Sequence, residues 1–564
     1  MAGPAPAPVR SGAEGGSGTG GPPQLVLTFH GAANTVTGSC LHLATPGGTL
    51  LIDCGLFQGP KALQALNYAP LPVDPGTLDA VILTHAHIDH AGLFPKLVRD
   101  GFRRRAWATA ATCDLLHWVL SDAAAIQESE AERANRRNRK RDQPDTLPLY
   151  TLADAQRSLE HLSPVGRDAW FEPVPGARAR LRNAGHILGA AWLEMEIFGR
   201  PGDRPLRLAV SGDIGPRAKT LAHDPTPLDP VDVLVLEATY GDRDRPAADE
   251  AGRRAALASE VRDAMAAGGN LVIPSFAVER SQEVIHDLLV LSRRRQIPAV
   301  RIFLDSPLAH RATDVFRRHA RELELDGDAA TAFAGPNLHI VETVEQSKAI
   351  SRIQSGAVII AGSGMCDAGR VKHHLKDNLW RTQSTVLFVG YQAPGTLGQV
   401  IHGGADRVRI HGEEVAVRAR IRSLDLYSGH ADRSGLLEWA TPAARGAQAV
   451  FLVHGEVDAL ASLRKGLADA GVDPQRIRVP ELDDGFALLG SPDSRAVEAR
   501  PPSRRRADPE LRRALSLGRD WHNDYAATLL DLRRALLAAT DDAARHRMLE
   551  RLRAALAANG GGRG

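Results

Sequence analysis

The stretch LTHAHIDH, residues 83–90, directly follows the apolar run Ala-Val-Ile and places three histidines and an aspartate within six positions. In extended backbone His85 and His87 point to the same side, whereas Asp89 and His90 can turn toward a second point. Imidazole nitrogens and carboxylate oxygens are common ligands of zinc and other divalent metals. Because HxHxDH after an apolar strand is rare by chance, the stretch predicts a site for two adjacent metal ions.

Two metals need more ligands than four residues supply, and polar residues beside glycine at other strand ends are the candidates. His186 lies in the segment AGHILGA, and Asp213 lies in the segment SGDIG. An aspartate carries two oxygens and can therefore bridge two metals, a role that no histidine can fill. Asp53 ends another apolar run; it could be a further ligand, but it more simply orients a ligand through a hydrogen bond.

Length and composition indicate a globular protein of several domains. The 564 residues are 43% hydrophobic, and 69 Lys and Arg against 67 Asp and Glu give a net charge of +2, which points to neither a nucleic-acid nor a membrane partner. Cysteines without CxxC pairing favour reduced thiols in a cytoplasm. They are Cys40, Cys54, Cys113 and Cys366. Neither a signal peptide nor a run of about 18 apolar residues is found, so we expect a cytoplasmic protein without a membrane partner.

The texture of the chain changes at Gln24. Residues 1–23 are mostly Gly, Pro, Ala and Ser and predict a flexible tail. From Gln24 to about Leu489 short β-rich runs alternate with helical segments. This alternation predicts an α/β fold with ligand sites at the carboxyl ends of the strands. A basic stretch, residues 132–142, is expected to be the solvated end of a helix.

Residues 490–564 predict a linker and a helical extension. The linker is rich in Pro and Arg, and two segments with leucines at helical spacing follow it. The leucines are Leu529, Leu532 and Leu536 in the first segment and Leu549, Leu552 and Leu556 in the second, with Thr540 and Asp541 as the break. We expect a helical hairpin that serves packing or oligomerisation, in preference to RNA binding. A homodimer is left open.

Five successive motifs resemble those of the metallo-β-lactamase superfamily. They are HGAANTVTGSC, LLIDCGLFQG, THAHIDHAG, AGHILGA and SGDIG, in this order. The resemblance implies an αββα sandwich with two metals, usually zinc, at its edge. By this resemblance His85, His87 and His186 hold one zinc ion, Asp89 and His90 hold the other, and Asp213 bridges them. The superfamily contains many hydrolases and some oxidoreductases, so the fold alone does not give the substrate.

The second half of the chain resembles the β-CASP family, the nucleic-acid-cutting branch of that superfamily. The motifs are LEATYGDR with Glu237, DLYSGHADRSGL with His430 and AVFLVHGE with His454, and further similar stretches are IPSFAVERSQE, FLDSPLA, AGSGMCDAGRVKHHL and GYQAPGTLGQVI. The resemblance implies an α/β domain, residues 242–426, inserted into a metallo-β-lactamase domain of residues 24–241 and 427–489. The histidine at 454 implies RNA, because the DNA-repair branch tends to carry an apolar residue there.

The function that we expect is zinc-dependent hydrolysis of RNA, in RNA processing or decay. Two zinc ions per chain would activate a hydroxide and leave products with 5′-phosphate and 3′-hydroxyl ends. His430 is expected to donate a proton to the leaving 3′-oxygen, with Glu237 orienting it, and His454 to complete the second zinc site. Asp89 and Asp53 are counted with these catalytic residues.

RNA contacts are expected at Arg280 and at Ser363 and Gly364, where AGSGM follows a strand and opens a helical stretch. A tight glycine turn is the competing interpretation of AGSGM. Glu279 departs from the family pattern, which commonly has Gly there, and adds a negative charge beside Arg280. The alternatives to a ribonuclease are a DNA or small-ester hydrolase on the same site and a non-catalytic RNA-binding subunit. Endonuclease and 5′-exonuclease modes both stay open.

Overall fold

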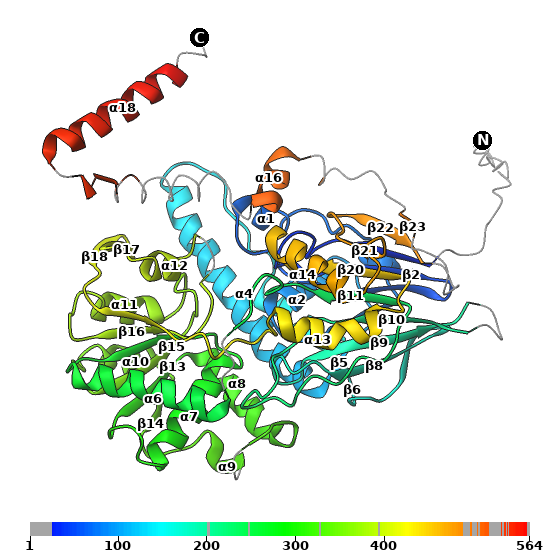
Figure 1. The fold of residues 1–564 in the computed structure, drawn as a ribbon, viewed down its shortest axis with the longest axis horizontal. Helices are drawn as coiled ribbons and strands as arrows, with labels where there is room; N and C mark the ends of the chain where they lie inside the picture. Colours follow the sequence, from blue (N-terminus) through cyan, green and yellow to red (C-terminus); the bar gives the residue numbers. More distant parts are fainter. Residues whose placement is uncertain are drawn as a thin grey trace, which may run out of the picture.

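The computed structural model describes residues 25–199, 204–245, 249–325, 329–392 and 395–488, and then 497–498, 505, 508–517, 541–560 and a few positions between 532 and 539. Two lobes lie side by side in this part of the chain (Figure 1). We call them the two-sheet lobe, which contains β1–β11 and β20–β23, and the one-sheet lobe, which contains β12–β19.

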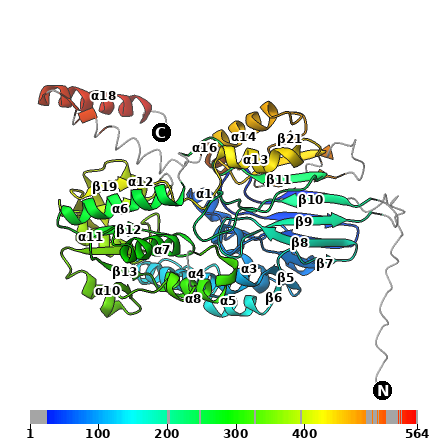
Figure 2. The same cartoon turned by 60° about the horizontal axis from the view of Figure 1, so that its bottom comes forward.

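The two-sheet lobe is a sandwich of two sheets with helices outside. One sheet has the described strands β23 (Val497–Glu498), β22 (Asp484–Ala487), β1 (Val26–Phe29), β2 (Leu41–Thr45), β3 (Gly48–Ile52), β4 (Ala80–Ile82), β5 (Arg105–Thr109) and β6 (Leu162–Val165), in that order. The other has β21 (Ile477–Arg478), β20 (Ala449–Val453), β11 (Val233–Glu237), β10 (Leu206–Val210), β9 (Ala191–Ile197), β8 (Ala177–Asn183) and β7 (Phe171–Val174). The view of Figure 2 separates the layers.

Alternation of side chains builds the core of this sandwich. Along β2, for example, inward residues such as Leu41 and Leu43 are buried, and the residues between them are partly exposed. Phe29 and Phe451, from β1 and β20, meet between the sheets with ring centroids 5.0 Å apart. Residues more than 400 positions apart in the chain therefore close one core.

The helices of the two-sheet lobe cover its outer faces. They are α1 (Lys61–Ala65), α2 (Ile88–Ala91), α3 (Phe94–Arg99), α4 (Ala110–Arg139), α5 (Leu152–Leu159), α13 (Arg433–Ala444) and α14 (Val457–Asp469). The long helix α4 extends toward the one-sheet lobe (Figure 1), and its C-terminal turns contain most of the basic stretch.

The one-sheet lobe is built on a parallel sheet. Its strand order is β14 (Leu338–Ile340), β13 (Arg301–Asp305), β15 (Ala357–Ala361), β12 (Leu271–Pro274), β16 (Thr385–Phe388) and β19 (Arg420–Ser423), and β17 (Arg407–Ile410) pairs with β18 (Glu413–Ala416) in a hairpin. The surrounding helices are α6 (Glu250–Ala266), α7 (Arg280–Arg293), α8 (Pro307–Arg318), α9 (Ala329–Ala332), α10 (Val344–Ile350), α11 (Val371–Asn378) and α12 (Leu397–His402). Because all pairings in this sheet are parallel, the carboxyl ends of its strands share one edge.

The predicted fold class is confirmed: an αββα sandwich carries an inserted α/β domain. The chain leaves the sandwich after β11 and returns to it at α13 and β20. None of the helices in the described residues combines the length and apolar character that a bilayer crossing requires. The four cysteines are free thiols.

The region beyond Leu488 is more structured than the predicted linker. Helix α16 (Pro509–Leu517) packs Leu511 and Ala514 against Leu63 and Phe57 of the two-sheet lobe. Burial of these apolar side chains explains why this part of the chain is attached to the lobe. The second predicted C-terminal helix corresponds to α18 (Asp542–Gly560). Only a few positions between 532 and 539 of the first predicted helix are described, and Leu529 and the tail of residues 1–23 lie outside the described residues.

Candidate metal centre

The predicted ligands come together at one edge of the sandwich, where several strands end. His85 and His87 follow β4, and Asp89 and His90 lie on α2. His186 lies between β8 and β9, Asp213 follows β10, and His454 follows β20. Gly55 lets the loop after β3 pass against α2, because a Cβ atom there would lie 1.7 Å from the carbonyl oxygen of Asp89.

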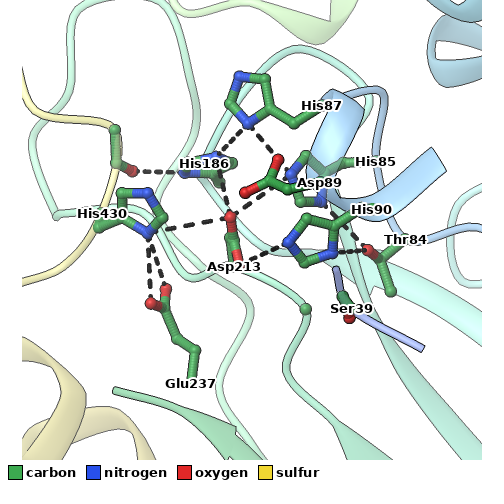
Figure 3. A network of polar contacts seen from close by, with 12 residues as sticks. Ser39, Thr84, His85, His87, Asp89, His90, His186, Asp213, Glu237 and His430 are labelled. Carbon is green, nitrogen blue, oxygen red and sulfur yellow. Dashed lines mark hydrogen bonds and ion pairs between the residues drawn. The ribbon is translucent and has the colours of Figure 1, made fainter. Parts of the chain in front are cut away.

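The first group of side chains contains His85, His87, His186 and Asp213 (Figure 3). Nδ1 of His87 lies 3.2 Å from Nε2 of His85 and 3.1 Å from Nε2 of His186. Oδ2 of Asp213 lies 3.4 Å from Nε2 of His85 and 3.5 Å from Nε2 of His186. Three ring nitrogens and one carboxylate oxygen thus surround a common point, which suits a tetrahedral metal ion.

The second group contains Asp89, His90 and His454, and it meets the first at Asp213. Nε2 of His90 lies 3.1 Å from Nε2 of His454 and 3.2 Å from Oδ1 of Asp213. Oδ2 of Asp89 lies 3.6 Å from Nε2 of His454. One oxygen of Asp213 therefore faces each group, which is the arrangement that a bridging carboxylate requires.

Hydrogen bonds at the far nitrogen of three of the rings leave the inner nitrogen of each as a ligand. Nδ1 of His186 bonds the carbonyl oxygen of Gly429 at 2.8 Å, and Nδ1 of His454 lies 3.0 Å from the hydroxyl of Thr239. Nδ1 of His90 lies 2.7 Å from Oδ2 of Asp53. Such partners fix the tautomer and orientation of metal-binding imidazoles.

Asp53 therefore lies behind His90 and not among the ligand atoms. It also accepts hydrogen bonds from the backbone N–H of Thr84 at 2.8 Å and from its hydroxyl at 2.9 Å. Of the two roles that the sequence left open, this geometry favours orientation of a ligand over direct metal binding.

Burial sets the protonation of the first group. Burial lowers the pKa of His85 and His186 well below the ordinary value, and it lowers the pKa of His87 to about 4. These imidazoles are thus neutral at pH 7, the form that binds metals. Burial acts in the same direction at His90 and His454, but the carboxylates of Asp213 and its neighbours raise the pKa of both rings. The carboxylates around the second group therefore favour a positive charge at this position.

The residues fit a pair of divalent cations. Oδ1 of Asp213 is buried and, within the described residues, accepts no hydrogen bond of good geometry. Buried polar atoms normally have a partner, so this oxygen indicates a place for a cation. The surrounding ring nitrogens are imidazole donors, which suit zinc and other first-row transition metals. His87 and Asp89 are partly exposed, which makes their side of the site the one open to solvent.

His430 and Glu237 form a pair beside the ligands. Nδ1 of His430 lies 3.2 Å from Oε2 of Glu237 and 3.9 Å from Oδ2 of Asp213. Glu237 is fully buried at the end of β11, and Oε1 accepts the backbone N–H of Ile214 at 2.6 Å. The carboxylate is thus fixed by the residue that follows Asp213, and it orients the His430 ring toward the site.

A buried ion pair that the sequence interpretation missed holds the His186 loop. Nζ of Lys219 lies 2.8 Å from Oε1 of Glu279 and donates to the carbonyl oxygen of His186. Oε2 of Glu279 accepts the N–H of Leu188 at 3.0 Å. Glu279 has φ 72°, a conformation that favours glycine, so the ion pair offsets backbone strain. The only signal in the sequence was the departure from Gly at 279.

The predicted RNA-contact residues lie at the carboxyl ends of strands in the one-sheet lobe. Nη1 of Arg280 already donates to the carbonyl oxygen of Val389 at 2.9 Å. Ser363 is occupied in a turn, with its N–H donating to the carbonyl oxygen of Ala368 at 3.1 Å. The expectation that AGSGM opens a helix is wrong, because α11 begins only at Val371. The turn interpretation of this segment therefore agrees better with the structure.

Comparison with known proteins adds three family matches. The family described as the metallo-beta-lactamase superfamily matches residues 33–152, the Beta-Casp domain matches residues 281–401, and the Zn-dependent metallo-hydrolase RNA specificity domain matches residues 414–480. The last of these includes His430 and His454, and the first includes the HxHxDH stretch.

Individual relatives cover most of the chain. It is 37% identical over 456 residues to Ribonuclease TTHA0252 of Thermus thermophilus, across 80% of this chain and 98% of that protein. It is 30% identical over 453 residues to Transcription termination factor FttA of Methanosarcina mazei, across 78% of this chain and 68% of that protein. A crystal structure of a protein of unknown function from Enterococcus faecalis V583 aligns with a TM-score of 0.46 and 12% identity, over 82% of this chain and 100% of that chain.

Proposed function

The chain belongs to the β-CASP family of the metallo-β-lactamase superfamily, and we propose that it is a zinc-dependent ribonuclease that hydrolyses RNA phosphodiester bonds. The observation that carries the proposal is the convergence of imidazole and carboxylate ligands on the two oxygens of Asp213, next to the His430–Glu237 pair. The chain is 37% identical to a ribonuclease across 98% of that protein's length, which supports RNA as the substrate.

In this proposal the ligands divide between two zinc ions. His85, His87 and His186 would hold the first, Asp89, His90 and His454 would hold the second, and Asp213 would bridge them. The chemistry that two bound zinc ions supply is a lower pKa for coordinated water, toward about 7, and neutralisation of the phosphate charge. The neutral state of His85 and His186, which follows from their lowered pKa, keeps their lone pairs available for this purpose.

The chain itself has to protonate the leaving group. His430 is the candidate. Its Nδ1 donates a hydrogen bond to Glu237, which leaves its Nε2 to donate a proton to the leaving group. Its side chain is 19% exposed, whereas that of Glu237 is fully buried, so the imidazole faces the substrate side. Donation to the 3′-oxygen leaves a 5′-phosphate on one product and a 3′-hydroxyl on the other. Such ends are typical of RNA processing and decay by hydrolysis.

The RNA contacts predicted at Arg280, Ser363 and Gly364 stay part of the proposal. They share the strand edge of the one-sheet lobe that adjoins Glu279 and the His186 loop. Positive charge along this path would make RNA binding weaken as salt rises, because counterions compete for the phosphates.

The experiment is cleavage of end-labelled RNA by the wild-type chain and by Asp89→Asn, with product ends and positions determined by sequencing gels. The proposal expects 5′-phosphate and 3′-hydroxyl ends from the wild type and almost no product from Asp89→Asn. Internal products would indicate an endonuclease, and a ladder from the 5′ end would indicate an exonuclease.

Two substrates serve as controls. Single-stranded DNA of the same sequence and bis(p-nitrophenyl) phosphate are offered in parallel. RNA that is cut no faster than either would contradict the ribonuclease assignment and favour a less selective hydrolase. RNA binding without cleavage, in a chain that holds no zinc after reconstitution, would indicate a non-catalytic subunit instead.

A further inference from the structure

Two exposed aromatic rings lie at the edge of the one-sheet lobe that faces the metal centre. Phe276 follows the carboxyl end of β12, and Tyr391 lies in the loop that follows β16. Their exposed fractions are 37% and 36%, so both rings present a surface to solvent. Ligands of parallel sheets bind at this edge, outside the carboxyl ends of the strands.

Direct contacts make the two rings part of one surface. The side-chain amide of Gln392 donates to the carbonyl oxygen of Gly364 at 3.1 Å. A Cβ atom on Gly364 would lie 2.8 Å from the ring of Phe276, so the turn at Gly364 passes directly over that ring. The turn after β15 therefore joins the loops that carry Phe276 and Tyr391.

Each ring also contacts a guanidinium group. The guanidinium carbon of Arg280 lies 5.7 Å from the ring centroid of Phe276, and that of Arg243 lies 5.5 Å from the ring centroid of Tyr391. Cation–π contacts of this length attract the guanidinium to the ring face. Arg243 is also paired with Asp242 at 2.9 Å, so the positive charge that favours an anionic ligand beside the exposed rings comes mainly from Arg280.

The surface continues to the catalytic pair through Tyr240. The ring of Tyr240 lies 6.5 Å from that of Tyr391 and 5.8 Å from that of His430, with near-perpendicular planes in both cases. Arg245 stacks on Tyr240 at 5.3 Å and donates to the carbonyl oxygen of His430. A ligand on Tyr391 is thus two ring contacts away from His430.

We propose that Phe276 and Tyr391 form a nucleobase subsite, on which bases of the RNA next to the scissile phosphate stack. This inference rests on the proposed ribonuclease function. An exposed ring surface beside guanidinium groups matches a ligand with aromatic bases on an anionic backbone. The subsite accepts any base, because every base has an aromatic face. It selects single-stranded over paired RNA, because only an unpaired base can leave its own stack and lie on a protein ring.

The test measures binding and cleavage of single-stranded oligoribonucleotides by the full chain. One substrate contains 2-aminopurine next to the cleavage position, and a matched one is abasic there. Stacking quenches 2-aminopurine fluorescence, and we expect quenching with the wild type that is largely lost in Tyr391→Leu and in Phe276→Leu. We also expect the base-bearing substrate to bind about tenfold more tightly than the abasic one to the wild type. In the two variants this ratio falls toward one.

Trp380→Leu is the matched control. Trp380 is 52% exposed and has the guanidinium of Arg381 at 5.0 Å, but it follows α11, on the way back to the amino end of β16. This variant should keep wild-type quenching and the tenfold ratio. Tyr391→Trp keeps an aromatic ring at this position and should therefore keep the quenching that Tyr391→Leu loses, if stacking is the cause.

Three outcomes would overturn the subsite: equal binding of the base-bearing and abasic substrates by the wild type, equal loss on both substrates in the variants, or the same loss in Trp380→Leu. Failure of the ribonuclease proposal is distinguishable, because quenching is measured on binding alone, whereas that proposal fails when the wild type binds but does not cut RNA.

Discussion

Each lobe buries a carboxylate among side chains that bear or attract positive charge, but the spacing differs. In the one-sheet lobe Asp287 lies 3.0 Å from Nε of Arg253 and 2.8 Å from Nε of Arg254, and it accepts the hydroxyl of Tyr427 at 2.8 Å. In the two-sheet lobe Asp213 lies 3.2–3.9 Å from the nearest imidazole nitrogens.

The difference in spacing reflects different sources of positive charge. Asp287 has two permanent cations at hydrogen-bond distance, so its charge is balanced by the chain itself. Asp213 is surrounded by imidazoles, two of which are neutral because burial lowers their pKa. A buried carboxylate without permanent cations favours a cation from outside, and in the proposed function that cation is a metal ion. We therefore expect the Asp287 cluster to be structural and the Asp213 cluster to be a metal-binding site.

Replacement of the bridging carboxylate should have the largest effect. Asp213→Asn removes the negative charge shared by both metal groups, so we expect RNA cleavage to fall by at least about 10³-fold and bound zinc to drop below one ion per chain. Stopped assays on labelled RNA and elemental analysis measure the two quantities. Wild-type zinc content in this variant would contradict the bridging role.

Removal of the proposed acid should affect cleavage but not metal content. For His430→Ala we expect turnover to fall by about 10² to 10⁴-fold, because the leaving oxygen loses its proton donor. The zinc content should stay near that of the wild type, since His430 is not among the proposed ligands. An equal loss of zinc would instead make His430 a ligand or a support of the site.

Asp287→Asn should destabilise the one-sheet lobe and leave the zinc content unchanged. It leaves Arg253 and Arg254 buried beside a neutral amide, so we expect the free energy of unfolding to fall by about 3 kcal/mol. Urea unfolding followed by circular dichroism gives this value. A cost below about 0.5 kcal/mol would mean that the cluster is not structural.

The same cluster predicts a pH dependence. Burial alone would raise the pKa of Asp287, but the neighbouring His286 and the two arginines lower it to about 2 from an ordinary value of 3.8. A lowered pKa contributes stability above pH 4 that is lost as the pH falls toward 2, about 2 kcal/mol in total. Asp287→Asn should lose this part of the acid dependence, which unfolding at pH 6, 4 and 3 measures.

The smallest effect is expected at the ion pair between the lobes. Lys219→Met removes a hydrogen bond to the His186 carbonyl and leaves Glu279 buried without its cation. We expect zinc affinity to fall about tenfold, as for other residues that support metal ligands. Competition with a chromophoric chelator measures it. If affinity does not change, the pair supports the lobe contact alone.

The sequence predicted which side chains gather at the edge of the sandwich, because its signals are local. His85, His87, Asp89 and His90 lie within six residues, and the strand before them is apolar, so their direction follows from the backbone. His186 and Asp213 stood beside glycines next to β-rich runs, where the strand edge of the sandwich gathers them. These positions needed no knowledge of tertiary contacts.

Contacts between distant segments could not be predicted in this way. Lys219 and Glu279 are 60 residues apart and belong to different lobes, and neither lies in a pattern that marks its partner. The attachment of α16 through Leu511 also depends on an apolar surface that exists only in the folded lobe. The attachment of α16 could not be seen in the composition, because the segment is rich in arginine and its average polarity resembles that of a linker.

The edge around Asp213 is proposed to bind two metal ions. The direct measurement is the number of zinc ions per chain, by inductively coupled plasma mass spectrometry, after chelator treatment, reconstitution and desalting. We predict two ions for the wild type and for Asp287→Asn, and fewer than one for Asp213→Asn. A wild-type chain that holds no zinc, or an Asp213→Asn chain that still holds two ions, would contradict the account.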